Sequence, residues 1–224
     1  MNIKRNRLIQ LFLFLSIVLL LVTVSYILTI NDESNNKILL YNIFFVETNS
    51  TATSFNLRQM CSIESAAKNN PNAQINVLSI NAKIQIDDLF ETYKNIKYIK
   101  LFPKDIFQDT PLYDWWISNK LTKYSEYYTY AHLADALRLA VVCKYGGFYL
   151  DLDMITLRSV KPLSYKLQFV ASTENDYSKV GSGFIHSPKS HPFIHHLMSE
   201  FAKNYDPNGW AVCKYVHIKY FYFI

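Results

Sequence analysis

Hydrophobic and polar positions divide the chain into an uncharged N-terminal stretch and a longer region in which strand and helix patterns alternate. Residues 8–30 contain no charged side chain. At about 1.5 Å per helical residue, this stretch is long enough to cross the ~30 Å hydrocarbon core of a bilayer. Three basic residues precede it and two acidic residues follow it. The positive-inside bias therefore predicts a transmembrane signal anchor, with residues 1–7 as a cytoplasmic tail and the remainder across the membrane.

A cleaved signal peptide is the alternative interpretation of the same stretch. Its apolar region usually has about 7–15 residues and ends at small residues. The run here is longer and ends with Tyr26 to Ile30. We therefore favour a single-pass type II protein of the Golgi membrane, with residues 31–38 as a short polar stem and the rest in the lumen.

From residue 39 onward, apolar runs with strand character alternate with helical periodicity. The expected strands are 39–46, 75–80, 96–102, 148–152 and one near Phe169, and the expected helices are 57–68, 87–94, 131–144 and 193–204. Residues 103–130 give no clear pattern, and Gly181-Ser182-Gly183 suggests a turn. Alternating units of this kind predict an α/β domain over 39–210, with a mostly parallel sheet and helices on both faces.

Charge limits the classes of partner. The whole chain has 23 basic and 18 acidic residues, a net charge of +5. Three of the basic residues precede the predicted anchor, so the predicted lumenal part has a net charge of only +2. It has no basic run interleaved with aromatic residues, so we do not expect nucleic acid as a partner.

Cysteines and a glycosylation sequon are interpreted in the light of this topology. Cys61, Cys143 and Cys213 are too few for a disulfide framework, and none has metal-ligand spacing. Cys61 and Cys143 fall in predicted helices, where we expect buried thiols. Asn49-Ser50-Thr51 is an acceptor sequence for N-glycosylation on the lumenal side.

The segment with the most chemical information is Tyr145 to Asp153, which reads YGGFYLDLD. In an extended strand Asp151 and Asp153 would point the same way, roughly 7 Å apart. Two carboxylates suit a hydrated Mg²⁺ or Mn²⁺ that keeps positions open for diphosphate oxygens. Ligands of open α/β sheets bind beyond the carboxyl ends of the strands, where this pair lies. The alternative is a strand end with two solvated acids.

The helix directly upstream adds three polar side chains to this region. His132, Asp135 and Arg138 are spaced three apart and share one face of the predicted helix. Asp135 and Arg138 could form a surface ion pair, which stabilises a helix by only a few tenths of a kcal/mol. They could instead hold sugar hydroxyls and oppose phosphate charge, for which a guanidinium is well suited. At least one of Gly146 and Gly147 is expected to cap the helix.

These segments together resemble a known family. Residues 134–138 (ADALR) and 144–153 (KYGGFYLDLD) resemble the donor-binding core of the Asp-x-Asp sugar transferases. Within that group they are most similar to the α-1,4-glycosyltransferase family of lactosylceramide 4-α-galactosyltransferase and α-1,4-N-acetylglucosaminyltransferase. The similarity includes residues 45–48 and 58–67 upstream and extends over roughly 40–210. Related enzymes often have Ser at the position of Ala134.

The resemblance implies a GT-A fold, a UDP-sugar donor, a divalent metal (Mn²⁺ or Mg²⁺) and retention of anomeric configuration. It implies that Asp151 and Asp153 bind the metal and donor, with Asp153 the more direct ligand. Asp135 and Arg138, with Asp151, would contact the donor sugar. The first strand, near Phe45 and Val46, would border the nucleotide. No catalytic base or nucleophile is identified.

The chain departs from the family pattern after Gly209-Trp210. Family members continue into a Gly/His/Pro-containing acceptor-side region, whereas residues 211–224 form an atypical, aromatic-rich tail. We therefore expect the donor half to be present and part of the acceptor half to be absent. This leaves a second hypothesis, a catalytically impaired UDP-sugar-binding protein that pairs with a full-length transferase.

A phosphatase-like hydrolase is a further alternative, because its Asp-x-Asp motif also ends a hydrophobic strand. Its nucleophile strand normally comes early in the domain, whereas Asp151 stands far along this chain. We favour a UDP-sugar-dependent α-1,4-hexosyltransferase that acts on a glycolipid or glycoprotein glycan.

Overall fold

The computed structural model describes residues 19–20, 23–24, 41–81, 84, 91–121, 128–174 and 179–208. The chain divides into two units, residues 1–38 and 39–224. Among the described residues, no helix is both long and apolar enough to cross a membrane. Most of the predicted anchor at 8–30 lies outside them, as do the stem and the tail at 211–224, so these assignments remain predictions.

The second unit is built on a mixed sheet whose six described strands follow the order β3-β2-β1-β4-β6-β5. Its strands are β1 (Tyr41–Glu47), β2 (Ala73–Ser79), β3 (Ile96–Lys100), β4 (Gly147–Leu150), β5 (Val170–Glu174) and β6 (Lys179–Ser187). The first four are parallel to one another, whereas β6 runs antiparallel to both β4 and β5. The expected α/β class is confirmed, with an antiparallel edge added to the expected parallel sheet.

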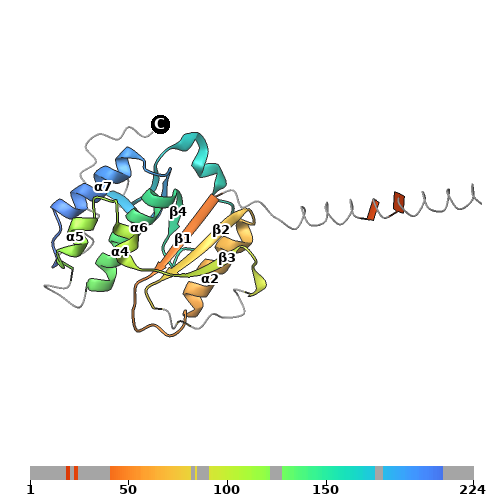
Figure 1. The fold of residues 1–224 in the computed structure, drawn as a ribbon, viewed down its shortest axis with the longest axis horizontal. Helices are drawn as coiled ribbons and strands as arrows, with labels where there is room; N and C mark the ends of the chain where they lie inside the picture. Colours follow the sequence, from red (N-terminus) through yellow and green to blue (C-terminus); the bar gives the residue numbers. More distant parts are fainter. Residues whose placement is uncertain are drawn as a thin grey trace, which may run out of the picture. The chain divides into compact units, whose positions relative to one another are not determined.

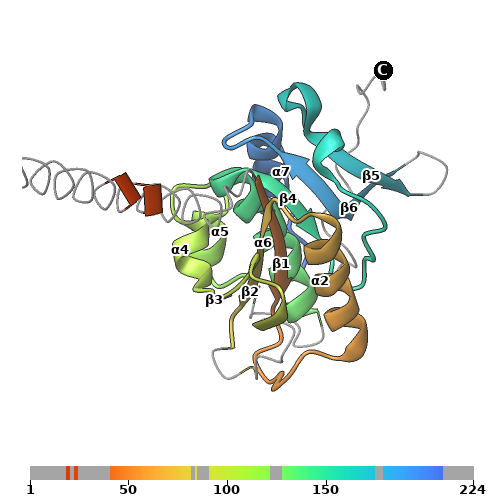
Figure 2. The ribbon, with the colours of Figure 1, turned by 90° about the vertical axis from the view of Figure 1, so that its right-hand side faces the viewer.

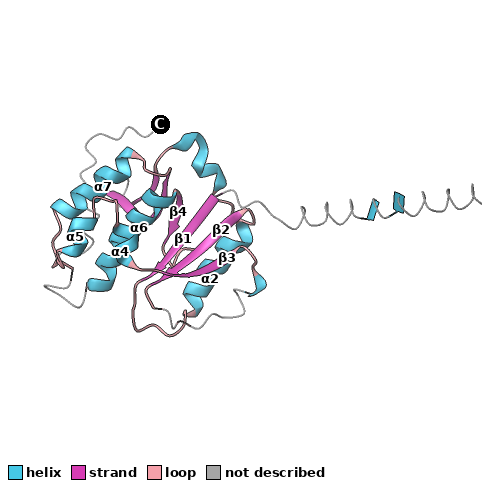
Figure 3. Ribbon diagram, in the orientation of Figure 1, coloured by secondary structure: helices cyan, strands magenta, loops and turns pink. Residues whose placement is uncertain are grey.

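Helices cover both faces of this sheet, as predicted (Figure 1, Figure 2). They are α2 (Leu57–Asn69), α4 (Pro103–Phe107), α5 (Tyr113–Ile117), α6 (Thr129–Tyr145), α7 (Pro192–Lys203) and the 3-10 helix η1 (Lys161–Leu167). Helix α2 lies on one face, whereas α4, α6 and α7 lie on the other (Figure 3). Two hydrophobic cores result, one on each side of the sheet.

The central strand β1 contributes alternate residues to these two cores. Phe44 and Val46 pack in the core on the α6 side, whereas Ile43 and Phe45 pack in the core on the α2 side. This alternation follows from the two-residue period of a strand. Because β1 is buried on both faces, its sequence is an almost continuous apolar run.

Local signals define the two helices that flank the site. Asn56 caps α2 by accepting a hydrogen bond from the Gln59 backbone N–H, and the Gln59 side chain accepts from the Asn56 N–H. This capping box satisfies two backbone donors at the start of the helix. Gly146, at a φ of 69°, caps the end of α6, as predicted. A Cβ at Gly147 would lie 2.5 Å from the Asn42 carbonyl oxygen, so β1 and β4 can pair only around a glycine.

Several sequence-based expectations need correction or completion. Gly181-Ser182-Gly183 is not a turn, because β6 runs through it. Residues 103–130, which gave no clear pattern, include α4, α5 and the first residues of α6. Cys143 is buried as expected, but Cys61 is exposed because it lies on the solvent side of α2. Most of the expected helix at 87–94, and Cys213, lie outside the described residues.

Candidate functional site

A wide cleft of about 820 Å³ opens where β1 and β4 end. That volume lies within the ~300–1,000 Å³ typical of ligand sites. Residues from β1, the start of α2, α6 and the end of β4 form its walls. They are Val46, Glu47, Asn56, Leu57, Arg58, Gln59, Ala134, Tyr149, Asp151, Leu152 and Asp153. Both predicted metal ligands therefore line one cavity at the carboxyl ends of parallel strands, as expected for an α/β sheet.

The two aspartates reach this cleft by a geometry that differs from the predicted one. Strand β4 ends at Leu150, before the first aspartate. The backbone N–H of Met154 donates to the Asp151 carbonyl at 3.0 Å, so residues 151–154 form a turn. The expected strand alternation is thus wrong for this pair, and it is the turn that brings both residues to the cleft.

The carboxylate of Asp151 is held by the protein on both oxygens. The Tyr149 hydroxyl donates to Oδ1 at 2.6 Å. The Arg138 guanidinium lies 3.4 Å from Oδ2. The Asp151 backbone N–H donates to the Gly183 carbonyl at 2.8 Å, which ties the motif to β6. A carboxylate fixed in this way is preorganised to receive a hydrogen-bonding ligand.

Arg138 links this carboxylate to the polar residues of α6 and β6. Its guanidinium pairs with Asp135 at 3.0 Å and donates to the Ser182 hydroxyl at 2.8 Å. It also lies 5.1 Å from the centre of the Tyr149 ring. Asp135 and Arg138 are only 7% and 8% exposed, so the surface ion-pair interpretation is wrong. Removing one member of such a buried pair leaves the other charge buried without a partner, which lowers the free energy of unfolding by about 3–5 kcal/mol.

The structure also places His132, which was predicted to share this polar face, and Tyr149, which the sequence did not single out. His132, expected on the same polar face, is buried and hydrogen-bonded to Tyr205 at 3.0 Å, away from the aspartates. Burial raises the pKa of Tyr149 well above its usual value, which the Arg138 charge partly opposes. Tyr149 therefore stays protonated and acts as a hydrogen-bond donor to Asp151.

Side chains of helix α2 form hydrogen bonds with the backbone of the turn at residues 151–154 and of the loop that follows it. The Ser62 hydroxyl donates to the Met154 carbonyl at 2.6 Å. One turn later, the Ser65 hydroxyl accepts from the Thr156 backbone N–H at 2.9 Å. Asn69 donates to the Thr156 carbonyl at 2.8 Å. This ladder of polar contacts fixes the loop that follows the aspartates to a rigid helix.

Asp153 differs from Asp151 because it is exposed. Within the described part of the chain, its carboxylate has no hydrogen-bond or ion-pair partner. No group of three or more His, Cys, Asp or Glu side chains suited to a metal occurs among the described residues. The two carboxylates that line the cleft, Asp151 and Asp153, fit a hydrated Mg²⁺ or Mn²⁺, because such an ion takes one or two carboxylates and completes its shell with water and ligand phosphates.

The two predicted nucleotide-bordering residues lie on opposite sides of β1. Val46 lines the cleft. Phe45 is fully buried in the core on the α2 side, so any contact from that position would come from its backbone. Glu47, the last residue of β1, accepts hydrogen bonds from the Gln59 side chain at 2.7 Å and the Asn49 backbone at 2.8 Å. These bonds hold the loop after β1 against α2.

The sequon residue Asn49 lies in this same loop. Its side-chain oxygen accepts from the Thr51 backbone N–H at 2.9 Å and from the Thr51 hydroxyl at 2.8 Å. Its modification remains a prediction.

Sequence reasoning assigned no role to several residues of the site, among them Tyr149, which donates to Asp151. Arg58 at the cleft wall and Ser62 were included only as part of the segment 58–67 that resembles the family. Ser182 and Gly183 were taken for a turn. A glycine inside a strand often marks a place where another group comes close to the backbone. This pattern could have drawn attention to Gly183. A Cβ there would lie 2.9 Å from Asp151 Oδ2, so only glycine leaves room for the carboxylate.

Carboxylates in a turn at the end of a central strand, backed by a buried Asp–Arg pair, form a polar wall of the cleft at the carboxyl ends of the strands. Comparison with known families identifies the class of protein. Residues 56–170 match the family described as the glycosyltransferase sugar-binding region containing the DXD motif. The chain belongs to this family, and all the aspartates and the arginine discussed above lie within the matched region.

Similar curated proteins include two α-1,4-transferases. The chain is 35% identical over 178 residues to the lactosylceramide 4-alpha-galactosyltransferase of Pan troglodytes, covering 75% of this chain and 47% of that protein. It is 31% identical over 163 residues to the alpha-1,4-N-acetylglucosaminyltransferase of Homo sapiens, covering 67% of this chain and 45% of that one. The chain thus spans about half the length of these relatives.

Among solved structures, the PaToxG glycosyltransferase has a similar fold. Its TM-score is 0.56 at 17% identity, and the match covers 78% of this chain and 63% of that one. At this identity the likeness concerns the fold alone. It agrees with the predicted α/β arrangement, in which helices flank both faces of a sheet.

Proposed function

We propose that this protein is a metal-dependent, retaining glycosyltransferase that moves a hexose from a UDP-sugar to a glycan hydroxyl in α-1,4 linkage. The observation with most weight is the arrangement of Asp151 and Asp153 in one cleft, with the Arg138–Asp135 pair directly behind them. The names of the similar transferases support galactose or an N-acetylhexosamine as the sugar.

Each polar residue has a distinct task in this proposal. Asp153, which is exposed and has no partner among the described residues, would ligate Mn²⁺ or Mg²⁺. An ion held by Asp153 would supply positive charge to oppose the charge that develops on the leaving diphosphate. Asp151, held by Tyr149 and Arg138, would orient the donor, and Asp135 with Arg138 would contact the sugar hydroxyls. Carboxylates close to the sugar also suit the oxocarbenium-like character of glycosyl transfer.

The acceptor and the cellular setting are further parts of the proposal. We infer a glycolipid acceptor, with a glycoprotein glycan as the alternative, because one of the similar proteins is named for lactosylceramide. The uncharged stretch at 8–30 supports a single-pass type II protein of the Golgi membrane with its cleft in the lumen.

A donor screen tests the proposed reaction. The full chain would be incubated with Mn²⁺, a lactose-terminated acceptor and, in separate reactions, UDP-galactose, UDP-N-acetylgalactosamine or UDP-N-acetylglucosamine. We expect one donor to give UDP release that a chelator abolishes and that Asp151→Asn reduces by at least about 100-fold, which is the scale of losing one charge-stabilising group. Metal-dependent UDP binding without transfer would support the catalytically impaired form. Absence of UDP binding would contradict the donor-site assignment.

A further inference from the structure

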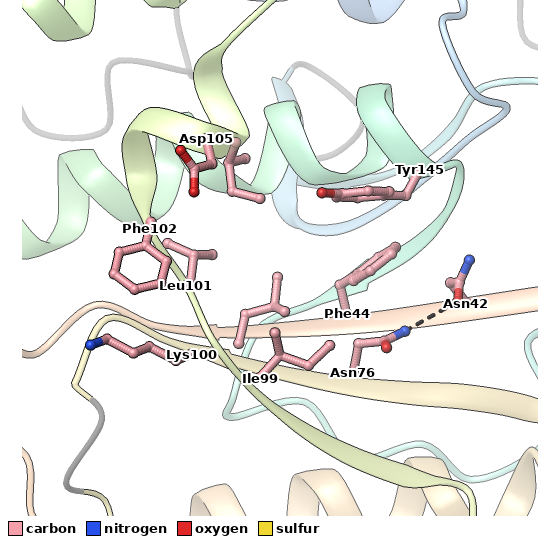
Figure 4. Close-up of a pocket in the computed structure, with 11 residues that line it drawn as sticks. Asn42, Phe44, Asn76, Ile99, Lys100, Leu101, Phe102, Asp105 and Tyr145 are labelled. Carbon is pink, nitrogen blue, oxygen red and sulfur yellow. Dashed lines mark hydrogen bonds between the residues drawn. The ribbon is translucent and has the colours of Figure 1, made fainter.

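A second cavity of about 350 Å³ lies between the sheet and helices α4 and α6 (Figure 4). Its lining includes two asparagines, and Asn76 donates to the Asn42 side chain and to the Gln74 carbonyl, both at 3.2 Å. The Asn76 amide is thus bonded within the protein. A clearer sign of a partner lies on the other face of the sheet, in the loop between β4 and η1, where Val160 packs in the core on the α2 side.

This loop presents two large apolar side chains to solvent. Ile155 is exposed, and Leu157 is 85% exposed. Thr156 between them is buried, and its backbone N–H and carbonyl are hydrogen-bonded to Ser65 and Asn69 of α2. Because these bonds fix the backbone at Thr156, the loop cannot turn its two apolar neighbours inward without breaking them.

Basic and further apolar side chains continue this surface. Arg158, Lys161 and Leu163 are all exposed. Residues 154–169 contain three basic residues and no acidic one, whereas the predicted lumenal part as a whole is close to neutral. Residues 155–163 thus form an apolar–basic segment. Such a segment suits a bilayer surface, because leucine enters the boundary between head groups and acyl chains while arginine and lysine pair with lipid phosphates.

The apolar–basic segment lies beside the first residue of β1. The Tyr41 hydroxyl is 3.4 Å from the Ser159 hydroxyl, and Lys161 Nζ is 4.9 Å from the centre of the Tyr41 ring. Residues 31–40 connect Tyr41 with the uncharged stretch at 8–30. Ten residues span at most about 36 Å, even when fully extended. The length of this connection keeps Tyr41 close to any bilayer that contains residues 8–30.

We propose that the apolar–basic segment rests on the bilayer surface. Ile155 and Leu157 enter the boundary between head groups and acyl chains, and the neighbouring basic side chains bind lipid phosphates. This inference rests on the type II membrane topology proposed above. Asp153, which lines the cleft, precedes Ile155 by only two residues. The contact therefore holds the donor cleft beside the lipid head groups, where a glycolipid acceptor presents its glycan.

Photo-crosslinking in lipid vesicles tests this contact on the full chain. The chain is reconstituted into phosphatidylcholine vesicles in which some lipids have a diazirine in the upper part of one acyl chain, and adducts are located by mass spectrometry. We expect adducts in two separate regions, residues 8–30 and residues 155–163. Adducts at 8–30 alone would overturn the surface contact and leave the anchor standing. Absence of adducts at 8–30 would refute the anchor, and this inference with it.

Two variants separate lipid contact from simple exposure. Leu157→Asp should lower the adduct yield at 155–163, relative to that at 8–30, by about tenfold, because moving one leucine out of an apolar environment shifts an equilibrium by at least that factor. Ile117→Asp, at a side chain of α5 that is 53% exposed, is the matched control and should leave the yield unchanged. A fall in both variants, or in neither, would overturn the proposal. Lys161–Lys161 cross-links between two chains in place of lipid adducts would assign the segment to self-association instead.

Discussion

Asp151 and Asp153 are two positions apart, yet their side chains have different surroundings. Asp151 accepts a 2.6 Å hydrogen bond from Tyr149 and lies 3.4 Å from Arg138, whereas Asp153 is exposed. A carboxylate already held by two groups is suited to orienting a ligand. One without partners among the described residues retains its full capacity to bind a cation. The proposed division between donor orientation and metal ligation follows from this difference.

Gly183 provides a first test at the residue scale. In Gly183→Ala, the new Cβ would lie 2.9 Å from Asp151 Oδ2, so the carboxylate must move. We expect UDP–Mn²⁺ affinity to fall at least tenfold, measured by calorimetry, because Asp151 then loses its geometry with Arg138. The melting temperature should fall only modestly, because the new Cβ clashes with a partly exposed side chain that can move. Unchanged affinity would mean that the position of Asp151 does not matter for the donor.

Arg58 provides a second test at this scale. It lies in the first turn of α2, lines the same cleft as Asp151 and Asp153, and has no ion-pair partner among the described residues. A guanidinium there is suited to bind a diphosphate. We expect Arg58→Gln to weaken UDP binding by about ten- to 150-fold and to leave uridine binding unchanged, because a hydrogen bond to a charged group contributes about 1.5–3 kcal/mol.

Arg158→Gln is the matched control for this substitution. Arg158 is also exposed, but it lies outside the cleft. The Arg158→Gln variant should bind UDP with the same affinity as the unsubstituted chain. Equal losses for UDP and uridine in Arg58→Gln would show that Arg58 contacts the nucleoside and would contradict the diphosphate role.

At the element scale, α6 organises much of the domain. It is buried on almost every side, from His132 to Cys143. Its polar residues are therefore inside the protein, where Asp135 and Arg138 form a paired site beside β4 and β6. Sequence periodicity predicted that these two residues share a face. It could not predict their burial, because β6, whose Ser182 contacts Arg138, is distant in the sequence.

Elements with regular patterns were predictable, and those shaped by tertiary contacts were not. The expected helices at 57–68 and 193–204 match α2 and α7 to within a residue at each end, because capping residues mark them. The turn after β4 and the passage of β6 through Gly183 depend on the packing of the Asp151 carboxylate. No local propensity encodes that contact. The short helices α4 and α5 are too brief to show a helical period.

Strand β6 contains the titratable group for a pH prediction. Burial lowers the pKa of His186, while its hydrogen bond to the Gln168 carbonyl raises it and the charges of Lys161 and His191 lower it. The folded state thus keeps His186 neutral. The unfolded chain takes up a proton below its usual pKa of about 6.5, so this stabilisation is lost as pH falls through that value.

Chemical denaturation between pH 7.5 and 5.5 measures this effect. The free energy of unfolding should fall with decreasing pH, and in His186→Gln the fall should be smaller, by up to about 1.4 kcal/mol per pH unit for one proton. His196→Gln, at an exposed histidine of α7, should keep the original slope. An identical slope in His186→Gln would show that this histidine is not held neutral by folding.

At the scale of the whole molecule, the domain consists of a mixed sheet between two hydrophobic cores, with the cleft at the ends of its central strands. The sequence alone was enough to predict the α/β class, the helices on both faces and the position of the two aspartates at a strand end. It was not enough to predict the roles of Ser62, Ser182 and Gly183. These residues act through contacts between elements that only the assembled sheet brings together.

We infer that the cleft binds a UDP-sugar through a divalent metal held by Asp153. Calorimetric titration of the full chain with UDP, with and without Mn²⁺, measures this metal dependence in the unsubstituted protein, in Asp153→Asn and in Asp114→Asn, an exposed control on α5. We predict metal-dependent binding that Asp153→Asn weakens by at least tenfold and Asp114→Asn leaves intact. UDP binding that is equal with and without Mn²⁺, or unchanged in Asp153→Asn, would contradict the metal site.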